Sequence, residues 1–295
     1  MTTFSGLFIG FLYSVMNTLN AEVSNTYGAV FAPVIIHLTG AVCLWILFLF
    51  PWGKRKGPAP WYLYTGGLMG IVTVIASNLG VQTVGLTASL ALMLLGQVVF
   101  SALFDHFKWF GAAPSRMSYM KGLGMLSIAA GSAIMIVFCM ESTATNILPA
   151  CALLLLSGLT IVMQRLINAA LALKTGAGYS AIMNHTTGLL GSLAFFCLSG
   201  FVIKTPSSGV MLPFYLYLGG PLGAFAVMTL NKLTRRISNL RMTLLLFVGQ
   251  IISGLLIDAF LLNKFSLYIL LGAVFAALGL CLNGLGEKRR AGGAL

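Results

Sequence analysis

"GQVVFSALFDHF" (residues 96–107) and "GQIISGLLIDAF" (residues 249–260) carry one pattern twice: Gly-Gln, seven residues, Asp, any residue and Phe. The two copies coincide when the chain is displaced by 153 residues. The same displacement aligns "YLYTGGLMG" (62–70) with "YLYLGGPLG" (215–223). Several matches in the same order along a chain indicate an internal repeat. The sequence therefore predicts two related units.

The repeat extends toward the N-terminus of each unit. A displacement of 148 residues aligns "HLTG" (37–40) with "HTTG" (185–188). The change from 148 to 153 falls between these matches and the tyrosine-containing ones, where we expect a loop that tolerates insertions. We assign residues 1–143 to the first repeat and residues 144–295 to the second.

The composition is that of a membrane protein. Hydrophobic residues make up 59% of the 295 residues, charged residues make up 7%, and the mean hydropathy is +0.98. Soluble domains have about 25% charged residues, and a helix that crosses a bilayer needs about 20 mostly apolar residues. We therefore predict an all-α membrane protein with ten transmembrane helices, five in each repeat. The predicted spans are 4–23, 27–50, 61–83, 85–107, 121–140, 146–167, 175–201, 212–234, 240–261 and 265–285.

The basic residues predict how the spans are oriented. Of the 17 Lys and Arg residues, 15 fall on one side of the predicted spans, among them Lys54, Arg165 and Lys174. Lys204 and Lys264 fall on the other side. Basic loops stay in the cytoplasm, so both termini are predicted to be cytoplasmic in a multi-pass protein of the inner membrane. Since five is odd, the second repeat enters the membrane from the opposite face, and inverted repeats are typical of secondary transporters.

The net charge of +12 does not indicate a nucleic-acid partner, because no basic run alternates with exposed aromatic residues. We expect the bilayer to be the partner of these charges, through acidic lipid headgroups. The five cysteines and three histidines show no metal-binding spacing. We expect no metal, no cofactor and no enzymatic activity.

Three functional classes remain open. The repeats favour a carrier of a small solute. A non-transporting regulatory or assembly subunit is the first alternative. A membrane enzyme acting on lipid-like substrates is a weaker alternative, because such chemistry needs a metal, paired carboxylates or a nucleophile with its base.

Ten spans arranged as five plus five inverted resemble the drug/metabolite transporter superfamily. The paired Gly-Gln stretches, preceded by Tyr-Leu-Tyr-x-Gly-Gly, are most similar to its YdcZ-like branch, over residues 4–285. This resemblance implies a fused pair of five-span units and a plasma-membrane carrier of small organic molecules, by export or exchange. A fused pair can be complete as a monomer, and a homodimer is left open.

Gln97 and Gln250 are the main candidates for the solute site. Each lies near the middle of its span, where a polar group is costly and indicates function. An amide offers two donors and an acceptor without charge, which suits a neutral or zwitterionic solute. We predict that both amides point into a central cavity between spans 4 and 9. The alternative is that they bond neighbouring helices.

His37 and His185 lie about ten residues into spans 2 and 7. An imidazole there can change protonation near neutral pH and couple solute movement to protons. The alternative is a neutral ring fixed by a neighbouring hydroxyl or carbonyl. We place both histidines in the predicted substrate site.

The other polar candidates lie at span ends or on the first helices. Asp105 and Asp258 end spans 4 and 9, where they act as gate ions or pair with Lys108 or Lys264. Small multidrug-resistance relatives use a deep Glu in the first span, and this chain has asparagines there instead. We add Asn17 and Asn184 to the substrate site, and the repeat-related Asn78 and Asn231 to the gate or coupling group.

Overall fold

The computed structural model describes residues 2–48, 57–107, 118–139, 147–204, 212–233, 239–261 and 267–292. Within these ranges the chain is all-helical, with ten α-helices and two short 3-10 helices. The elements are α1 (Thr2–Tyr27), α2 (Ala32–Phe48), η2 (Trp61–Thr65), α3 (Gly66–Val84), α4 (Leu86–Phe107), α5 (Tyr119–Cys139), α6 (Ile147–Thr175), α7 (Ala177–Leu198), η4 (Phe214–Leu218), α8 (Gly219–Leu233), α9 (Asn239–Phe260) and α10 (Leu267–Gly292).

Four helical segments within the described ranges are long and apolar enough to cross a membrane: Trp61–Val84, Ile147–Thr175, Ala177–Leu198 and Leu267–Gly286. The all-helical class is therefore confirmed, and the ten-span inverted topology stays a prediction. Buried polar residues lower the mean hydropathy of some of the other helices. The helix α1, for example, buries Ser14, Asn17 and Asn20.

The repeated tyrosine motif folds in the same way in both halves. Pro60 and Pro213 come just before η2 and η4, and the carbonyl of each proline accepts a hydrogen bond three residues on, at 3.1 and 3.0 Å. An α-helix then begins at the first glycine of each motif. The glycines that follow α1 and α6 also match, since Gly28 has φ +89° and Gly176 has φ +99°. A left-handed φ is easy for glycine and ends a helix there.

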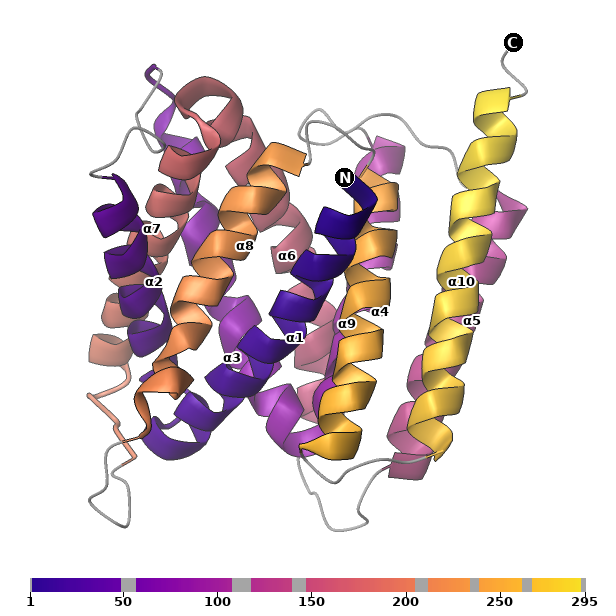
Figure 1. Cartoon of the computed structure of the whole chain (residues 1–295), viewed down its shortest axis with the longest axis horizontal. Helices are drawn as coiled ribbons and strands as arrows, with labels where there is room; N and C mark the ends of the chain where they lie inside the picture. Colours follow the sequence, from indigo (N-terminus) through magenta and orange to yellow (C-terminus); the bar gives the residue numbers. More distant parts are fainter. Residues whose placement is uncertain are drawn as a thin grey trace.

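Helices from the two halves pack against each other in matching pairs. The helix α9 packs on α1, and α4 packs on α6. In the same way α3 packs on α6 and α7, while α8 packs on α1 and α2. The helices α2 and α7 also pack on each other. Figure 1 shows a further pair, α5 and α10, side by side at the right edge, away from α2 and α7. Most helices of one half therefore pack against helices of the other.

Glycines set the closest of these crossings. A methyl group added to Gly96 would collide with the carbonyl of Leu155, and one added to Gly249 would collide with the carbonyl of Leu7. Leu155 and Leu7 are themselves equivalent under the displacement of 148 residues. The glycine of each Gly-Gln pair is thus a contact point between the halves, as small residues are in packed membrane helices.

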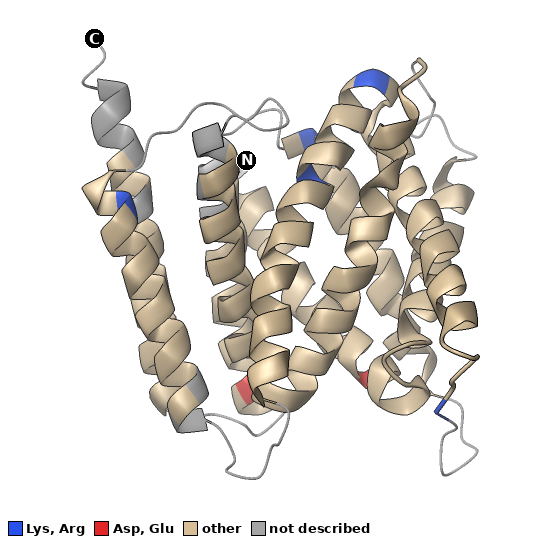
Figure 2. Cartoon of the chain, turned by 180° about the vertical axis from the view of Figure 1, so that it is seen from behind, with Lys and Arg blue, Asp and Glu red and all other residues tan. Residues whose placement is uncertain are grey.

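Most of the described charges lie near one end or the other of the helices. In Figure 2 most basic segments lie toward the upper end, while the acidic segments and one basic segment lie at the lower end. Figure 1 shows that α1 begins and α10 ends toward the same upper end. This end is the one that the charge rule predicts to be cytoplasmic.

Candidate solute-binding cavity

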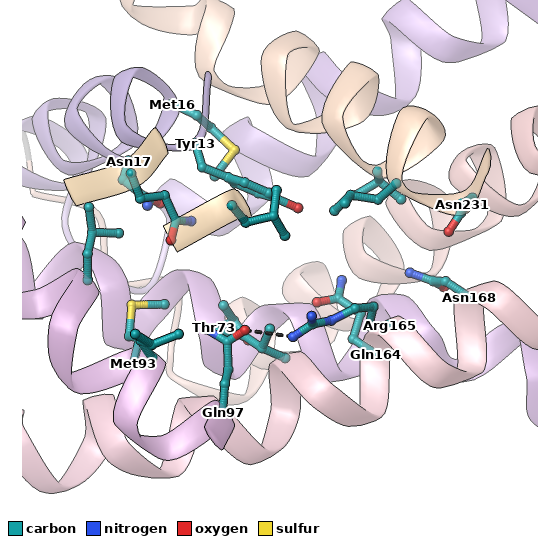
Figure 3. Close-up of a pocket in the computed structure, with 17 residues that line it drawn as sticks. Tyr13, Met16, Asn17, Thr73, Met93, Gln97, Gln164, Arg165, Asn168 and Asn231 are labelled. Atoms are coloured by element: carbon teal, nitrogen blue, oxygen red, sulfur yellow. Dashed lines mark hydrogen bonds between the residues drawn. The ribbon is translucent and has the colours of Figure 1, made fainter. Parts of the chain in front are cut away.

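A cavity lies between the two halves, with an empty volume of about 850 Å³ that includes its open part. Six helices line it, namely α1, α3, α4, α6, α8 and α9. Its polar lining residues are Tyr13, Asn17, Thr73, Gln97, Gln164, Arg165, Asn168, Asn231 and Gln250. The remainder is apolar, with Met16, Leu90, Met93, Leu94, Ile161, Val227, Leu230 and Leu246 (Figure 3).

The glycine crossings position both glutamines. Because Gly96 lets α4 approach α6 closely, the next residue, Gln97, reaches the side chain of Arg165. The Nη2 of Arg165 donates a hydrogen bond of 2.6 Å to Oε1 of Gln97 (Figure 3). On the other side Gly249 lets α9 approach α1, and the hydroxyl of Ser14 donates to the backbone carbonyl of Gln250 at 2.9 Å. The structure thus brings Gln97 and Gln250 to one cavity.

Arg165 also lines the cavity, although the sequence analysis did not select it for the solute site. The predicted sixth span ended at residue 167, and Arg165 was counted with the charges of the cytoplasmic side. The helix α6 continues to Thr175 and Gly176 follows with φ +99°, so ten helical residues come after Arg165. The internal repeat could have indicated this role, because a displacement of 148 residues aligns Arg165 with Asn17, which was already selected for the substrate site.

An amide network holds the α6 side of the cavity. Gln164 and Asn168 each donate a hydrogen bond of 2.9 Å from the side-chain amide to Oδ1 of Asn184. The hydroxyl of Ser180 donates to the carbonyl of Asn168 at 2.8 Å. Asn184 itself is buried in α7 and is not a lining residue. Its place is behind the two amides that line the cavity, neither of which was selected from the sequence.

The remaining asparagines divide between lining and packing. Asn17 lines the cavity, and its Oδ1 accepts a hydrogen bond of 3.1 Å from the hydroxyl of Ser77. Asn231 lines the cavity and donates to the carbonyl of Ala177 at 3.4 Å. Asn78, its repeat equivalent, is buried outside the lining.

The two histidines lie outside the cavity lining, at the contact between α2 and α7. Their ring centroids are 5.5 Å apart and the rings meet edge to face. His37 packs over Gly188 and His185 packs over Gly40, so that each ring fills the space above the glycine of the other copy's motif. Both are buried, and within the described residues none of their ring nitrogens has a hydrogen-bond partner.

Asp258 lies at the end of α9 and contacts the beginning of α4. Its Oδ2 accepts hydrogen bonds from the backbone N–H of Thr87, at 3.1 Å, and from the hydroxyl of the same residue. The unpaired N–H groups of a helix N-terminus favour such a carboxylate. Asp258 is buried here. The side chain of Asp105, and the predicted partners Lys108 and Lys264, lie outside the described residues.

Within the described ranges, no group of three or more His, Cys, Asp and Glu side chains is close enough to hold a metal ion. The lining therefore offers hydrogen-bonding amides, hydroxyls and one guanidinium, beside apolar surface. Such a lining binds and orients a solute.

An apolar, all-helical chain with a polar cavity between two similarly built halves has the architecture of a membrane transporter. The family comparison agrees with this class. A family model described as "Putative inner membrane exporter, YdcZ" matches residues 1–134 and 149–282, once in each half, and the chain belongs to this family.

The solved structures show similarity in fold. One crystal structure has a TM-score of 0.63 with 14% sequence identity, over 97% of this chain and 98% of the other. At this identity the similarity is one of fold alone. No match is found among the curated proteins.

Proposed function

We propose that this membrane transporter is a secondary carrier, which moves a small organic solute across the inner membrane by alternating access, in export or exchange. The observation that carries the proposal is the cavity, because equivalent residues of both halves, Gln97 and Gln250, line it together. A site shared by two related halves can be opened to either side when one half rocks against the other.

The proposed motion uses contacts already described. The glycine crossings of α4 with α6 and of α1 with α9 bring the helix backbones close together, and in this proposal the helices pivot there. The histidine pair lies on the α2–α7 contact, and we propose that it supports this contact rather than touching the solute. In this proposal both termini are cytoplasmic, which the distribution of charges in Figure 2 supports.

An apolar cluster lies at one end of the cavity, where Leu90 belongs both to the lining and to the cluster, and it joins α1, α3, α4 and α9. We propose that this cluster closes the cavity at that end. The bond between Asp258 and Thr87 lies at the same end. In the proposed topology this end faces outward, so we assign these contacts to an outer gate. The members of the cluster are Ala21, Val81, Leu86, Leu90 and Ile257.

A thermal-shift screen of the purified protein against fractions of small metabolites tests the binding site. A ligand that binds the folded protein raises its melting temperature by mass action. Losing one hydrogen bond to a desolvated solute costs about 1–3 kcal/mol, or roughly 5- to 150-fold in affinity. We expect an active fraction to act less strongly by this factor on Gln97→Ala and Gln250→Ala.

Thr229→Ala is the control, because Thr229 lies outside the lining and its hydroxyl donates within α8, to the carbonyl of Phe225 at 2.9 Å. An active fraction that acts equally on all three variants would place the site elsewhere. A fraction whose active compound is recovered chemically changed would favour the membrane enzyme.

A further inference from the structure

We propose that the solute is an organic anion, whose acidic group is bound by Arg165 inside the cavity. This inference deepens the proposed function and rests on it. It begins from the formal charges of the lining: among the 17 residues that line the cavity, Arg165 carries a positive charge and no aspartate or glutamate is present.

The depth of Arg165 in its helix indicates that its charge has a function. The residue lies well inside α6, with ten residues of the helix after it, and α6 is one of the helices that can cross a membrane. An ionisable residue at such depth is costly, and it marks the path of a substrate or ion. A guanidinium binds carboxylate and phosphate groups strongly, because two parallel N–H donors match their oxygens.

Gln97 helps to hold the guanidinium in position. The hydrogen bond of 2.6 Å from Nη2 to Oε1 joins a cation to an uncharged amide, and no carboxylate belongs to the residues that line the cavity. In Figure 3 the Arg165 side chain extends from α6 toward the space shared with Tyr13 of α1. The Tyr13 hydroxyl and the Asn17 amide offer neutral hydrogen bonds on that side.

The rest of the lining selects the body of the solute. Methionine and leucine side chains from α1, α4, α8 and α9 also line the cavity, beside its polar groups. Because the position equivalent to Arg165 in the first half is Asn17, the cavity has one cationic side only. An amphipathic solute with a single acidic group fits this asymmetry, and a cationic solute is disfavoured by repulsion.

The charge of the cavity can be measured without knowing the solute. The five native cysteines are replaced by serine, and a single cysteine is placed at Met93, which lines the cavity one helical turn before Gln97. Two methanethiosulfonates of similar size are then compared, one with a sulfonate group and one with a trimethylammonium group. The ratio of the two rates, divided by the ratio for a small thiol in water, reports the local potential.

We expect the anionic reagent to be favoured. At an effective dielectric constant of about 20, a unit charge within about 10 Å raises the local concentration of a monovalent anion roughly tenfold and lowers that of a monovalent cation by a similar factor. Arg165→Gln should therefore lower the normalised ratio by roughly 100-fold, and Arg165→Lys should keep it above one. Lys174→Gln, which removes an exposed charge from the same helix, should leave it unchanged.

The outcomes separate this inference from the proposed function. A normalised ratio at or below one in the parent protein overturns the anion site, even if Arg165→Gln does not fold. A ratio that Arg165→Gln leaves unchanged overturns it as well. If neither reagent reaches the cysteine, the cavity is never accessible and the proposed carrier itself fails. Slower labelling in vesicles with phosphatidylglycerol than in pure phosphatidylcholine would show that a lipid headgroup, and not a soluble anion, occupies the site.

Discussion

Substituting Asp258 by Asn should open the cavity at the end where α9 meets α4. In the described state the carboxylate accepts two hydrogen bonds from Thr87, one from the backbone and one from the hydroxyl. Asn keeps the shape and one acceptor oxygen but removes the charge. The contact should therefore weaken without leaving a cavity in the packing.

The size of the effect follows from the strength of these bonds. Hydrogen bonds to charged groups contribute about 1.5–3 kcal/mol and neutral ones about 0.5–1.5 kcal/mol. Losing the charge alone thus costs about 1–2 kcal/mol of closed-state stability, after allowing for two donors that share one oxygen. That difference raises the open fraction roughly 5- to 30-fold.

The assay is labelling of the Met93→Cys cavity cysteine from the outer face of right-side-out vesicles with an impermeant reagent. Asp258→Asn and Thr87→Val should both speed the labelling, and the double variant should add little, because both remove the same contact. Glu22→Gln is the control, since Glu22 is exposed on α1. Labelling of Asp258→Asn at the parent rate would refute the outer gate.

Three further results are expected. Gly96→Ala should lower the free energy of unfolding in detergent by about 1–3 kcal/mol, because the added methyl group meets the backbone of α6. Gly122→Ala should not, because nothing lies within 4 Å of that position. Equal unfolding midpoints for the two variants would show that the close crossing at Gly96 does not stabilise the protein. Asn184→Ala should weaken solute binding in titrations by roughly 5- to 150-fold, because the side-chain amides of two lining residues lose their common acceptor. An unchanged affinity would show that this hydrogen-bond network does not support the solute site. His37→Gln and His185→Gln should leave the pH profile of solute flux unchanged, since neither ring faces the cavity; a flattened profile would restore a proton relay.

The sequence was sufficient for the features that depend on repetition and composition. The displaced copies of the Gly-Gln stretch identified the two units, and the apolar runs matched the ten α-helices in order. The glutamines were chosen for their depth, their repetition and their amide chemistry, and both line the cavity. These features are local or periodic, so a single sequence contains them.

The remaining features depend on tertiary contacts that spacing cannot give. An arginine near the end of an apolar run usually marks a membrane face, and only the packing of α6 on α4 shows that Arg165 reaches Gln97 and the cavity. Depth along a helix does not tell which side a residue takes, so the histidines were assigned to a cavity that they do not line. The partner of Asp258 is Thr87, 171 residues away, and nothing in the local sequence of either residue indicates the other.

Release of solutes from proteoliposomes tests the carrier most directly. Vesicles containing the purified protein are loaded with a mixture of small metabolites, and the compounds that leave are identified by mass spectrometry against protein-free vesicles. The account predicts that a few compounds, anions among them, leave unchanged and at saturable rates. Gln97→Ala and Gln250→Ala should slow their release, while Thr229→Ala should not. If a correctly folded, inserted protein releases nothing beyond the protein-free vesicles, the carrier is contradicted and the regulatory or assembly subunit becomes the better reading.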